Sequence, residues 1–174
     1  MRAHEVKAII REAFTTTPRP CCRLADALVA DEYGNEAVRF AENDEHWWEV
    51  PIEHIEAVTA SFCFLPPASV PYYLPAYMTF ACDHYSAPRT GWLDNLRYFL
   101  ADGERIGSVL PLLSPAQRHA VCVFLEFLAT RCDRSLRRDG IDVGADPELN
   151  EYRQALTTIW LPSRPRTSSP CSAP

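Results

Sequence analysis

A proline-rich segment at residues 62–78, FCFLPPASVPYYLPAYM, constrains the fold more than any other part of the chain. Its four prolines, Pro66, Pro67, Pro71 and Pro75, interrupt a run of apolar residues that would otherwise form a buried helix. A proline inside a helix removes a backbone donor and costs roughly 3 kcal/mol, and it also restricts the residue before it to extended angles. The sequence therefore predicts an extended or single-turn segment, followed by a helix whose first residues include Pro75.

The tyrosines of the same segment allow two interpretations. Tyr72, Tyr73 and Tyr77 combine apolar rings with hydroxyl groups, which suits a half-buried surface. The favoured interpretation is a rigid connector in the core, and the alternative is an aromatic ridge that contacts a partner. On a helix Tyr73 and Tyr77 share a face, whereas Tyr72 lies about 100° away from Tyr73. We therefore expect Tyr72 to be the exposed tyrosine, whose replacement by alanine costs little stability.

Helical periodicity recurs on both sides of this segment. The strongest start signal is Ser114-Pro115-Ala116-Gln117, in which a serine cap, a proline at the first helical position and a glutamine form a capping box. Asp146 and Pro147 repeat this cap-and-proline pattern. Residues 47–50, WWEV, are compatible with a short strand or an aromatic turn, and residues 101–108, ADGERIGS, indicate a turn-rich loop. The expected helices are 4–14, about 22–33, 51–59, 76–85, 90–100, 114–132 and 146–160.

The fold class that follows is mostly α. Fifteen prolines against six glycines favour helices that begin at prolines over a sandwich with glycine turns. We expect residues 1–161 to form a single compact helical domain of about six helices with irregular proline-rich connectors, and one short strand pair remains an option. Residues 162–174, PSRPRTSSPCSAP, lack any core-forming pattern and predict a disordered tail.

Two blocks of the chain resemble a bacterial family of uncharacterised proteins. They are FLPPASVPYYLPAYM in the proline-rich segment and LSPAQRHAVCVFLEFLA in the capped helix, and the N-terminal helix adds to the likeness. The resemblance spans about residues 5–130, and Pro71 departs from the family's block. Because the shared motifs are apolar, the resemblance implies a shared fold and brings no activity to any residue.

Charge and cysteine content limit the partners and the compartment. A net charge of -6 argues against a general nucleic-acid binder, which needs a basic surface, and it is compatible with a basic protein partner. No apolar run approaches the eighteen or more residues that span a bilayer, so we expect no membrane association. The amphipathic N-terminus does not resemble a signal peptide. Seven cysteines without a CxxC pair predict a cytoplasmic protein with reduced thiols.

Signals for chemistry are weak. Cys82 and His84, with Cys63 or His54, could approach one another in the fold, but they lack the paired spacing of zinc sites. The sequence also lacks the motifs GxSxG, GxxxxGK[ST] and HExxH. We therefore assign no catalytic, cofactor-binding or metal-binding residues. An enzyme, specifically a hydrolase that uses carboxylates or a cysteine in an unfamiliar arrangement, is the alternative rather than the leading hypothesis.

Acidic and aromatic residues gather in residues 41–56, AENDEHWWEVPIEHIE. A solvated loop and helix face is the simplest explanation, but exposed tryptophan beside carboxylates also resembles a protein-binding hot spot. The leading hypothesis is a small acidic protein that acts by binding another protein, with an inhibitor or immunity-type protein as one form. A scaffold that only self-associates is a third possibility, and the sequence does not fix the oligomeric state. The candidate binding surface comprises Trp47, Trp48, Glu45, Glu49 and Tyr72.

Overall fold

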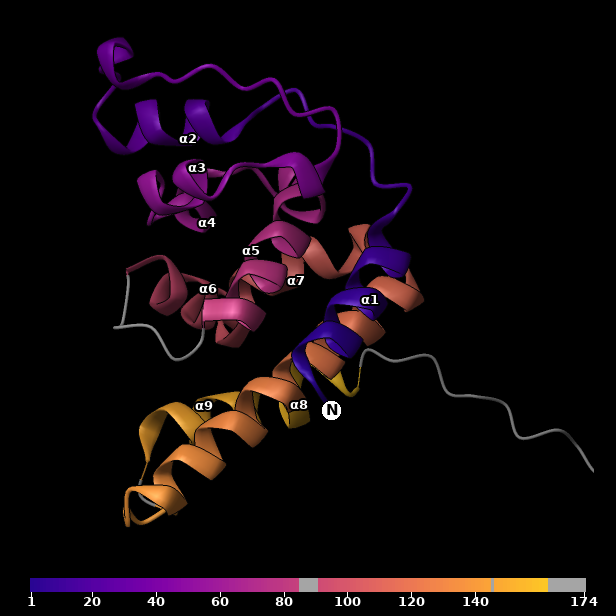
Figure 1. The fold of residues 1–174 in the computed structure, drawn as a ribbon. Coiled ribbons are helices and arrows are strands. Elements are labelled where there is room, and N and C mark those ends of the chain that lie inside the picture. Colours follow the sequence, from indigo (N-terminus) through magenta and orange to yellow (C-terminus); the bar gives the residue numbers. More distant parts are fainter. Residues whose placement is uncertain (85–90, 145, 163–174) are drawn as a thin grey trace, which may run out of the picture.

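The computed structural model of the protein describes residues 1–84, 91–144 and 146–162, and this part of the chain is mostly helical (Figure 1). No strand occurs in it, so the optional strand pair was wrong, and the WWEV stretch forms a 3-10 turn. The α-helices are α1 (Ala3–Phe14), α2 (Leu24–Asp31), α3 (Ile52–Ala57), α4 (Ser61–Phe64), α5 (Val70–His84), α6 (Gly91–Ala101), α7 (Gly103–Val109), α8 (Pro115–Arg138) and α9 (Pro147–Ala155). Short 3-10 turns join them, namely η1 (Glu36–Val38), η2 (Trp47–Glu49), η3 (Pro67–Ser69) and η4 (Leu110–Leu112). A π-helical segment, η5 (Leu156–Trp160), extends α9.

The predicted helix starts are confirmed where the sequence carries a cap. Ser114 Oγ accepts a hydrogen bond from the Gln117 backbone N–H at 3.2 Å, and Gln117 Oε1 accepts one from the Ser114 N–H at 2.8 Å. Asp146 Oδ1 accepts a hydrogen bond from the Leu149 N–H at 2.9 Å at the start of α9. These side chains satisfy backbone donors that a helix start leaves without partners, so the signal is local and readable from the sequence.

The proline-rich segment begins its helix earlier than expected. The turn η3 confirms the predicted single-turn segment, but α5 starts at Val70, so Pro75 lies in its interior. Pro71 falls in the first helical turn, where a backbone N–H has no intrahelical partner to lose. Every residue from 70 to 78 is buried, and this packing offsets the cost of Pro75. Tertiary contacts therefore override the local preference.

A second correction concerns residues 101–108. This stretch, expected to be a turn-rich loop, forms most of α7. The Asp102 side chain caps the helix by accepting hydrogen bonds from two backbone N–H groups of its first turn, at 3.0 and 3.2 Å. Ile106 and Val109 are buried. The cap and this burial offset the roughly 1 kcal/mol that each glycine costs inside a helix.

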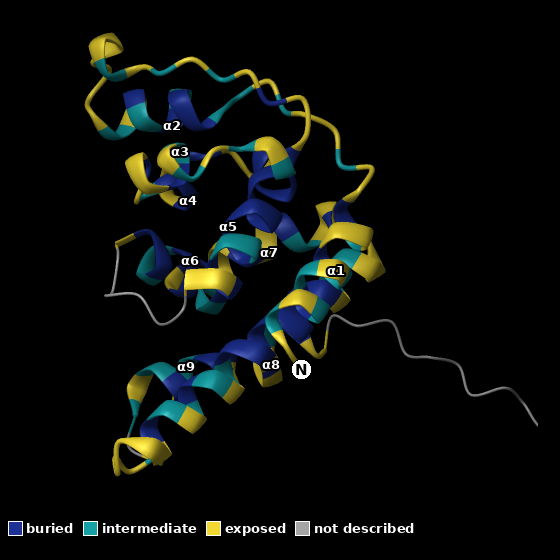
Figure 2. Ribbon diagram, in the orientation of Figure 1, coloured by how far each residue is buried: buried dark blue, intermediate teal, exposed yellow. Residues whose placement is uncertain are grey.

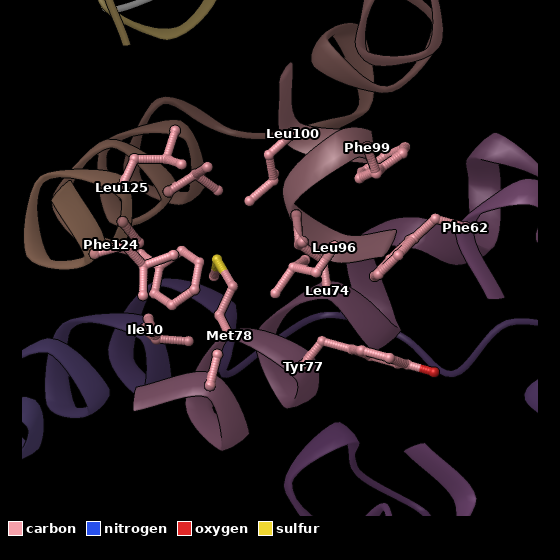
Figure 3. Close-up of a cluster of buried hydrophobic side chains, with 14 of the residues drawn as sticks. Ile10, Phe62, Leu74, Tyr77, Met78, Leu96, Phe99, Leu100, Phe124 and Leu125 are labelled. Atoms are coloured by element: carbon pink, nitrogen blue, oxygen red, sulfur yellow. The ribbon is translucent and has the colours of Figure 1, made fainter. Parts of the chain in front are cut away.

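Helix α5 occupies the centre of the domain and packs against α1 and α6 (Figure 1). In the core, Leu74 and Met78 of α5 gather with Ile10 of α1, Leu96 of α6 and Phe124 of α8 (Figure 3). Figure 2 shows the first turns of α5 in dark blue, whereas α1 keeps a row of exposed residues on its outer side. The turn η2 also packs against α5, and this contact places the two tryptophans beside α1.

Helix α8 packs along α1 and also along α9, which closes the C-terminal end of the domain (Figure 1). None of the described helices combines the length and the apolar character that crossing a bilayer requires. The predicted tail lies outside the described residues beyond Pro162, as do the last residue of the 76–85 helix and the first of the 90–100 helix.

Candidate functional site

The two neighbouring tryptophans have different environments. Trp47 is only 2 % exposed, and its indole Nε1–H donates a hydrogen bond to the Phe14 carbonyl at 3.0 Å. A buried indole needs such an acceptor, and the end of α1 supplies it. Trp48 is half-buried, with its ring edge-on to Trp47 at 5.5 Å. The expectation that Trp47 is a surface residue was therefore wrong, and Trp48 alone keeps an accessible ring.

Tyr72 was also expected at the surface, but it is 1 % exposed. Its hydroxyl donates a hydrogen bond to Asp44 Oδ2 at 2.8 Å, and Arg23 Nη2 donates to Asp44 Oδ1 at 2.6 Å. Tyr73 donates to Glu42 Oε1 at 3.3 Å. Because α5 begins at Val70, its first turn points both tyrosines at residues 42–44 rather than at water. We refer to Arg23, Glu42, Asp44, Tyr72 and Tyr73 as the arginine–tyrosine network.

Donors from several elements bind the carboxylates and carbonyls of this network. Glu42 Oε2 accepts a hydrogen bond from the Ala25 N–H at 3.1 Å, and the Glu42 carbonyl accepts one from Arg23 Nη1 at 3.0 Å. Burial, together with the Asp44 carboxylate, raises the pKa of Tyr72 well above its usual range, so the hydroxyl stays protonated and donates. The network thus fastens the segment 42–44 to α2 and α5, which is a structural role.

On another side of α5, the side chains leave a groove of about 480 Å³ between α1, the turn η2, α3 and α5. Helix α1 lines it with His4, Lys7, Ala8 and Arg11, and α5 contributes Thr79 and Asp83 among others. The volume falls in the range of about 300–1,000 Å³ that is typical of ligand sites. Besides Ala8, the apolar lining comprises Trp47, Trp48, Val50, Ile52, Ile55, Ala76 and Phe80.

Trp48 lies directly under a guanidinium group in this groove. The Cζ atom of Arg11 is 3.2 Å from the centroid of the Trp48 ring and 5.6 Å from that of Trp47. The His46 ring also stacks on Trp48, with centroids 4.3 Å apart. A guanidinium over an indole face is held by the electrostatic attraction between the cation and the ring. Arg11 itself is exposed, so this aromatic–cationic pair is open to a binding partner.

The predicted glutamates lie beside the groove but have another role. Both Glu45 and Glu49 are exposed. Glu49 Oε2 accepts hydrogen bonds from the backbone N–H groups of Glu45 and His46, at 2.9 and 3.1 Å, and these bonds lower the pKa of Glu49. Its carboxylate therefore closes the turn η2. Four of the five predicted surface residues gather at this turn, and Tyr72 does not join them.

Sequence reasoning missed the role of the basic residues on α1. His4, Lys7 and Arg11 are separated by three and four residues, so they lie along one face of the helix. Lys7 Nζ pairs with Asp83 at 2.7 Å, which connects α1 to the end of α5. The spacing was visible in the sequence, but it resembled an ordinary solvated face because nothing there indicated that Trp48 lies next to it.

A smaller hollow of about 400 Å³ bears on the hydrolase alternative, since Asp44, Glu49 and His54 all line it. Donors hold Asp44 through both carboxylate oxygens and Glu49 through one. The His54 ring stacks on Phe40 with centroids 4.0 Å apart. Both carboxylates are therefore taken up by hydrogen bonds that hold the fold together, which leaves fewer of their oxygens free to act on a substrate.

The cysteines considered for chemistry lie apart. Cys63 is exposed, and Arg105 Nη1 lies 3.0 Å from its sulfur, whereas burial, together with the Asp83 carboxylate, raises the pKa of Cys82 to about 12. A thiol with so high a pKa is a poor nucleophile. Across residues 1–84, 91–144 and 146–162, no three histidine, cysteine, aspartate or glutamate side chains are grouped to hold a metal ion.

Comparison with known proteins gives a family but no activity. A model described as "Family of unknown function (DUF6714)" matches residues 2–160. No curated protein and no solved structure matches the chain. The match spans every described helix, in agreement with the resemblance to an uncharacterised family that the sequence suggested.

Proposed function

We propose that this chain, which belongs to the DUF6714 family of unknown function, acts by binding another protein through the groove beside Trp48. The observation that carries the proposal is the half-buried Trp48 ring with the Arg11 guanidinium 3.2 Å from its centroid. Tryptophan and arginine are the residue types most enriched among the energetic hot spots of protein interfaces.

The surroundings of this pair support the same function. The groove is apolar at its base and polar at its edge, which is the usual anatomy of a protein interface. It is formed by two helices that pack directly against each other, α1 and α5. A site on packed helices is already arranged before the partner arrives, so binding requires little additional ordering.

Inhibitor or immunity-type binding is the specific form that we put forward. The carboxylates of the smaller hollow are already bonded to donors, and this weakens the hydrolase alternative. We also place the protein in the cytoplasm, because the six described cysteines, three of them buried, are free thiols. Reduced thiols persist in a reducing compartment.

Selection of peptides tests the proposal and does not require that the partner be identified first. The full chain is immobilised, a random peptide library is selected against it, and the enriched peptides are titrated by fluorescence anisotropy. We expect convergent peptides that lose at least about tenfold in affinity for Trp48→Ala, as hot-spot replacements do. Tyr33→Ala is the matched control, because Tyr33 is a fully exposed aromatic residue that does not line the groove.

Two results would overturn the proposal. The library could yield no convergent peptides, or the enriched peptides could bind Trp48→Ala as tightly as they bind Tyr33→Ala. Thermal melting of both variants establishes that each is folded before its affinity is compared with that of the unchanged chain.

A further inference from the structure

The groove also indicates what kind of segment it receives. We infer that its occupant is an apolar segment of a partner protein that carries a carboxylate, and that Arg11 binds this carboxylate. This inference rests on the proposed function and adds the chemistry of the partner. Three features carry the inference: the available N–H donors of Arg11, the ion pairs of the charged residues around it, and the exposed edge of the groove.

Arg11 lacks the carboxylate partner that many other arginines of the described chain have. Arg23, Arg39 and Arg97 each have a nitrogen within 4 Å of at least one carboxylate oxygen. Among the described residues no such ion pair forms at Arg11, whose guanidinium lies over Trp48 instead. Stacking occupies a face of the guanidinium plane, but its N–H donors lie in that plane and remain available. A planar set of N–H donors matches both oxygens of a carboxylate.

Among the charged residues that line the groove, Arg11 has no ion-pair partner within 4 Å in the described chain. Lys7 is already paired with Asp83 at 2.7 Å. The Glu49 carboxylate attracts Arg11 electrostatically, but it accepts its hydrogen bonds from the backbone of its own turn. His4 also lines the groove, and His46 stacks on Trp48. At physiological ionic strength charges are screened over roughly 8 Å, so the net charge of -6 acts weakly here compared with Arg11. The unpaired guanidinium of Arg11 therefore favours an acidic segment over the basic partner expected from the total charge.

The apolar lining completes the requirement. Trp48, Val50 and Phe80 offer surface for an apolar side chain next to the carboxylate.

The openness of the groove favours a protein segment over a small acid. His4, Ala8 and Arg11 line it and are all exposed. Sites for small molecules bury roughly 70–90 % of the ligand, which a groove with so exposed an edge does not provide. The body of a partner protein covers that edge, and the segment then fills the base.

The test uses the peptides selected against the full chain. We expect an aspartate, a glutamate or a free C-terminal carboxylate next to an apolar residue in the convergent sequence. Neutralising that carboxylate, by amide substitution or C-terminal amidation, should weaken binding by about tenfold, the scale of a charge-assisted pair. Comparing these two modifications distinguishes a side-chain carboxylate from a chain terminus.

The matching protein variant is Arg11→Ala, with Arg134→Ala as the control, because Arg134 is an exposed arginine of α8 that does not line the groove. In Arg11→Ala the acidic and neutralised peptides should bind alike, whereas Arg134→Ala should keep the tenfold difference. Because Arg11 is exposed, its replacement should leave the fold intact, which thermal melting confirms.

The remaining outcomes separate this inference from the proposed function. If convergent peptides need Trp48 but carry no acid, or if Arg11→Ala keeps the preference for the acid, the inference fails and protein binding stands. If a small apolar acid such as indole-3-acetate binds as tightly as the peptides, the occupant is a small molecule and the inference also fails. If no peptides converge, the proposed function itself fails.

Discussion

Helix α5 borders two regions, a sealed one and an open one. The loop of residues 42–50 contributes side chains to both of them. In the arginine–tyrosine network, Tyr72 and Tyr73 face the carboxylates of residues 42–44, and nearly all of this region is buried. In the groove, Phe80 faces a site whose edge is exposed at Arg11. Most polar atoms in the first region are hydrogen-bonded to one another, and Arg23 Nε lies 3.6 Å from Glu42 Oε2, whereas the guanidinium of Arg11 in the second region has no ion pair among the described residues. The first region therefore holds the loop, and the second is the one suited to recognition.

The largest loss of stability is expected when a charge is removed from the sealed region, the arginine–tyrosine network. Asp44→Ala leaves Arg23 and the Tyr72 hydroxyl without their shared partner. Breaking a buried ion pair from one side costs about 3–5 kcal/mol, so the free energy of unfolding in urea should fall by that amount. Glu45→Ala, an exposed neighbour, is the control and should change it by less than about 0.5 kcal/mol. Equal effects for the two variants would mean that the network does not hold the loop.

Removing a single hydroxyl group from Tyr72 tests the same network with a smaller expected loss of stability. Tyr72→Phe keeps the ring and removes only the hydroxyl that donates to Asp44. A hydrogen bond to a charged group contributes about 1.5–3 kcal/mol, and urea denaturation should show a loss of this size. Tyr98→Phe is the matched control, because Tyr98 is 57 % exposed and should tolerate the change. A negligible loss for Tyr72→Phe would restore the expectation of an exposed tyrosine.

The open region should contribute least to stability. Arg11→Ala removes the cation over Trp48 at an exposed position. Exposed cation–π pairs are worth about 0.5–1 kcal/mol, so the free energy of unfolding should drop by no more than that. Arg134→Ala is the control, because it measures how much the free energy of unfolding changes when an exposed arginine outside the groove is lost. A loss of several kcal/mol at Arg11 would show that the groove is part of the core rather than a free surface.

How well the sequence predicts each feature depends on how far apart in the chain its interacting residues lie. The caps at Ser114 and Asp146 involve residues three positions apart, so the sequence predicted both helix starts. The start of α5 at Val70 depends on the burial of Tyr72 against a segment almost thirty residues away, which no local pattern reports. Local proline preference consequently gave the wrong start.

The groove illustrates the same limit for a site. Sequence reasoning found the tryptophans and glutamates at η2, but not the basic residues of α1 that complete the groove. Nor could it separate Trp47 from Trp48, since both stand in the same acidic context. The carbonyl of Phe14 decides between them by accepting the Trp47 indole hydrogen bond, and that contact depends on the tertiary fold.

The most direct test of the account is therefore to compare the two tryptophans in one experiment. Urea denaturation of Trp47→Ala should show a loss of about 3–5 kcal/mol, the cost of emptying a buried aromatic site. Trp48→Ala, from a half-buried position, should lose only about 1–2 kcal/mol and yet bind the selected peptides at least about tenfold more weakly. If Trp48→Ala destabilises the protein as much as Trp47→Ala does, or leaves peptide affinity unchanged, the account of Trp48 as the accessible binding residue of the groove is contradicted.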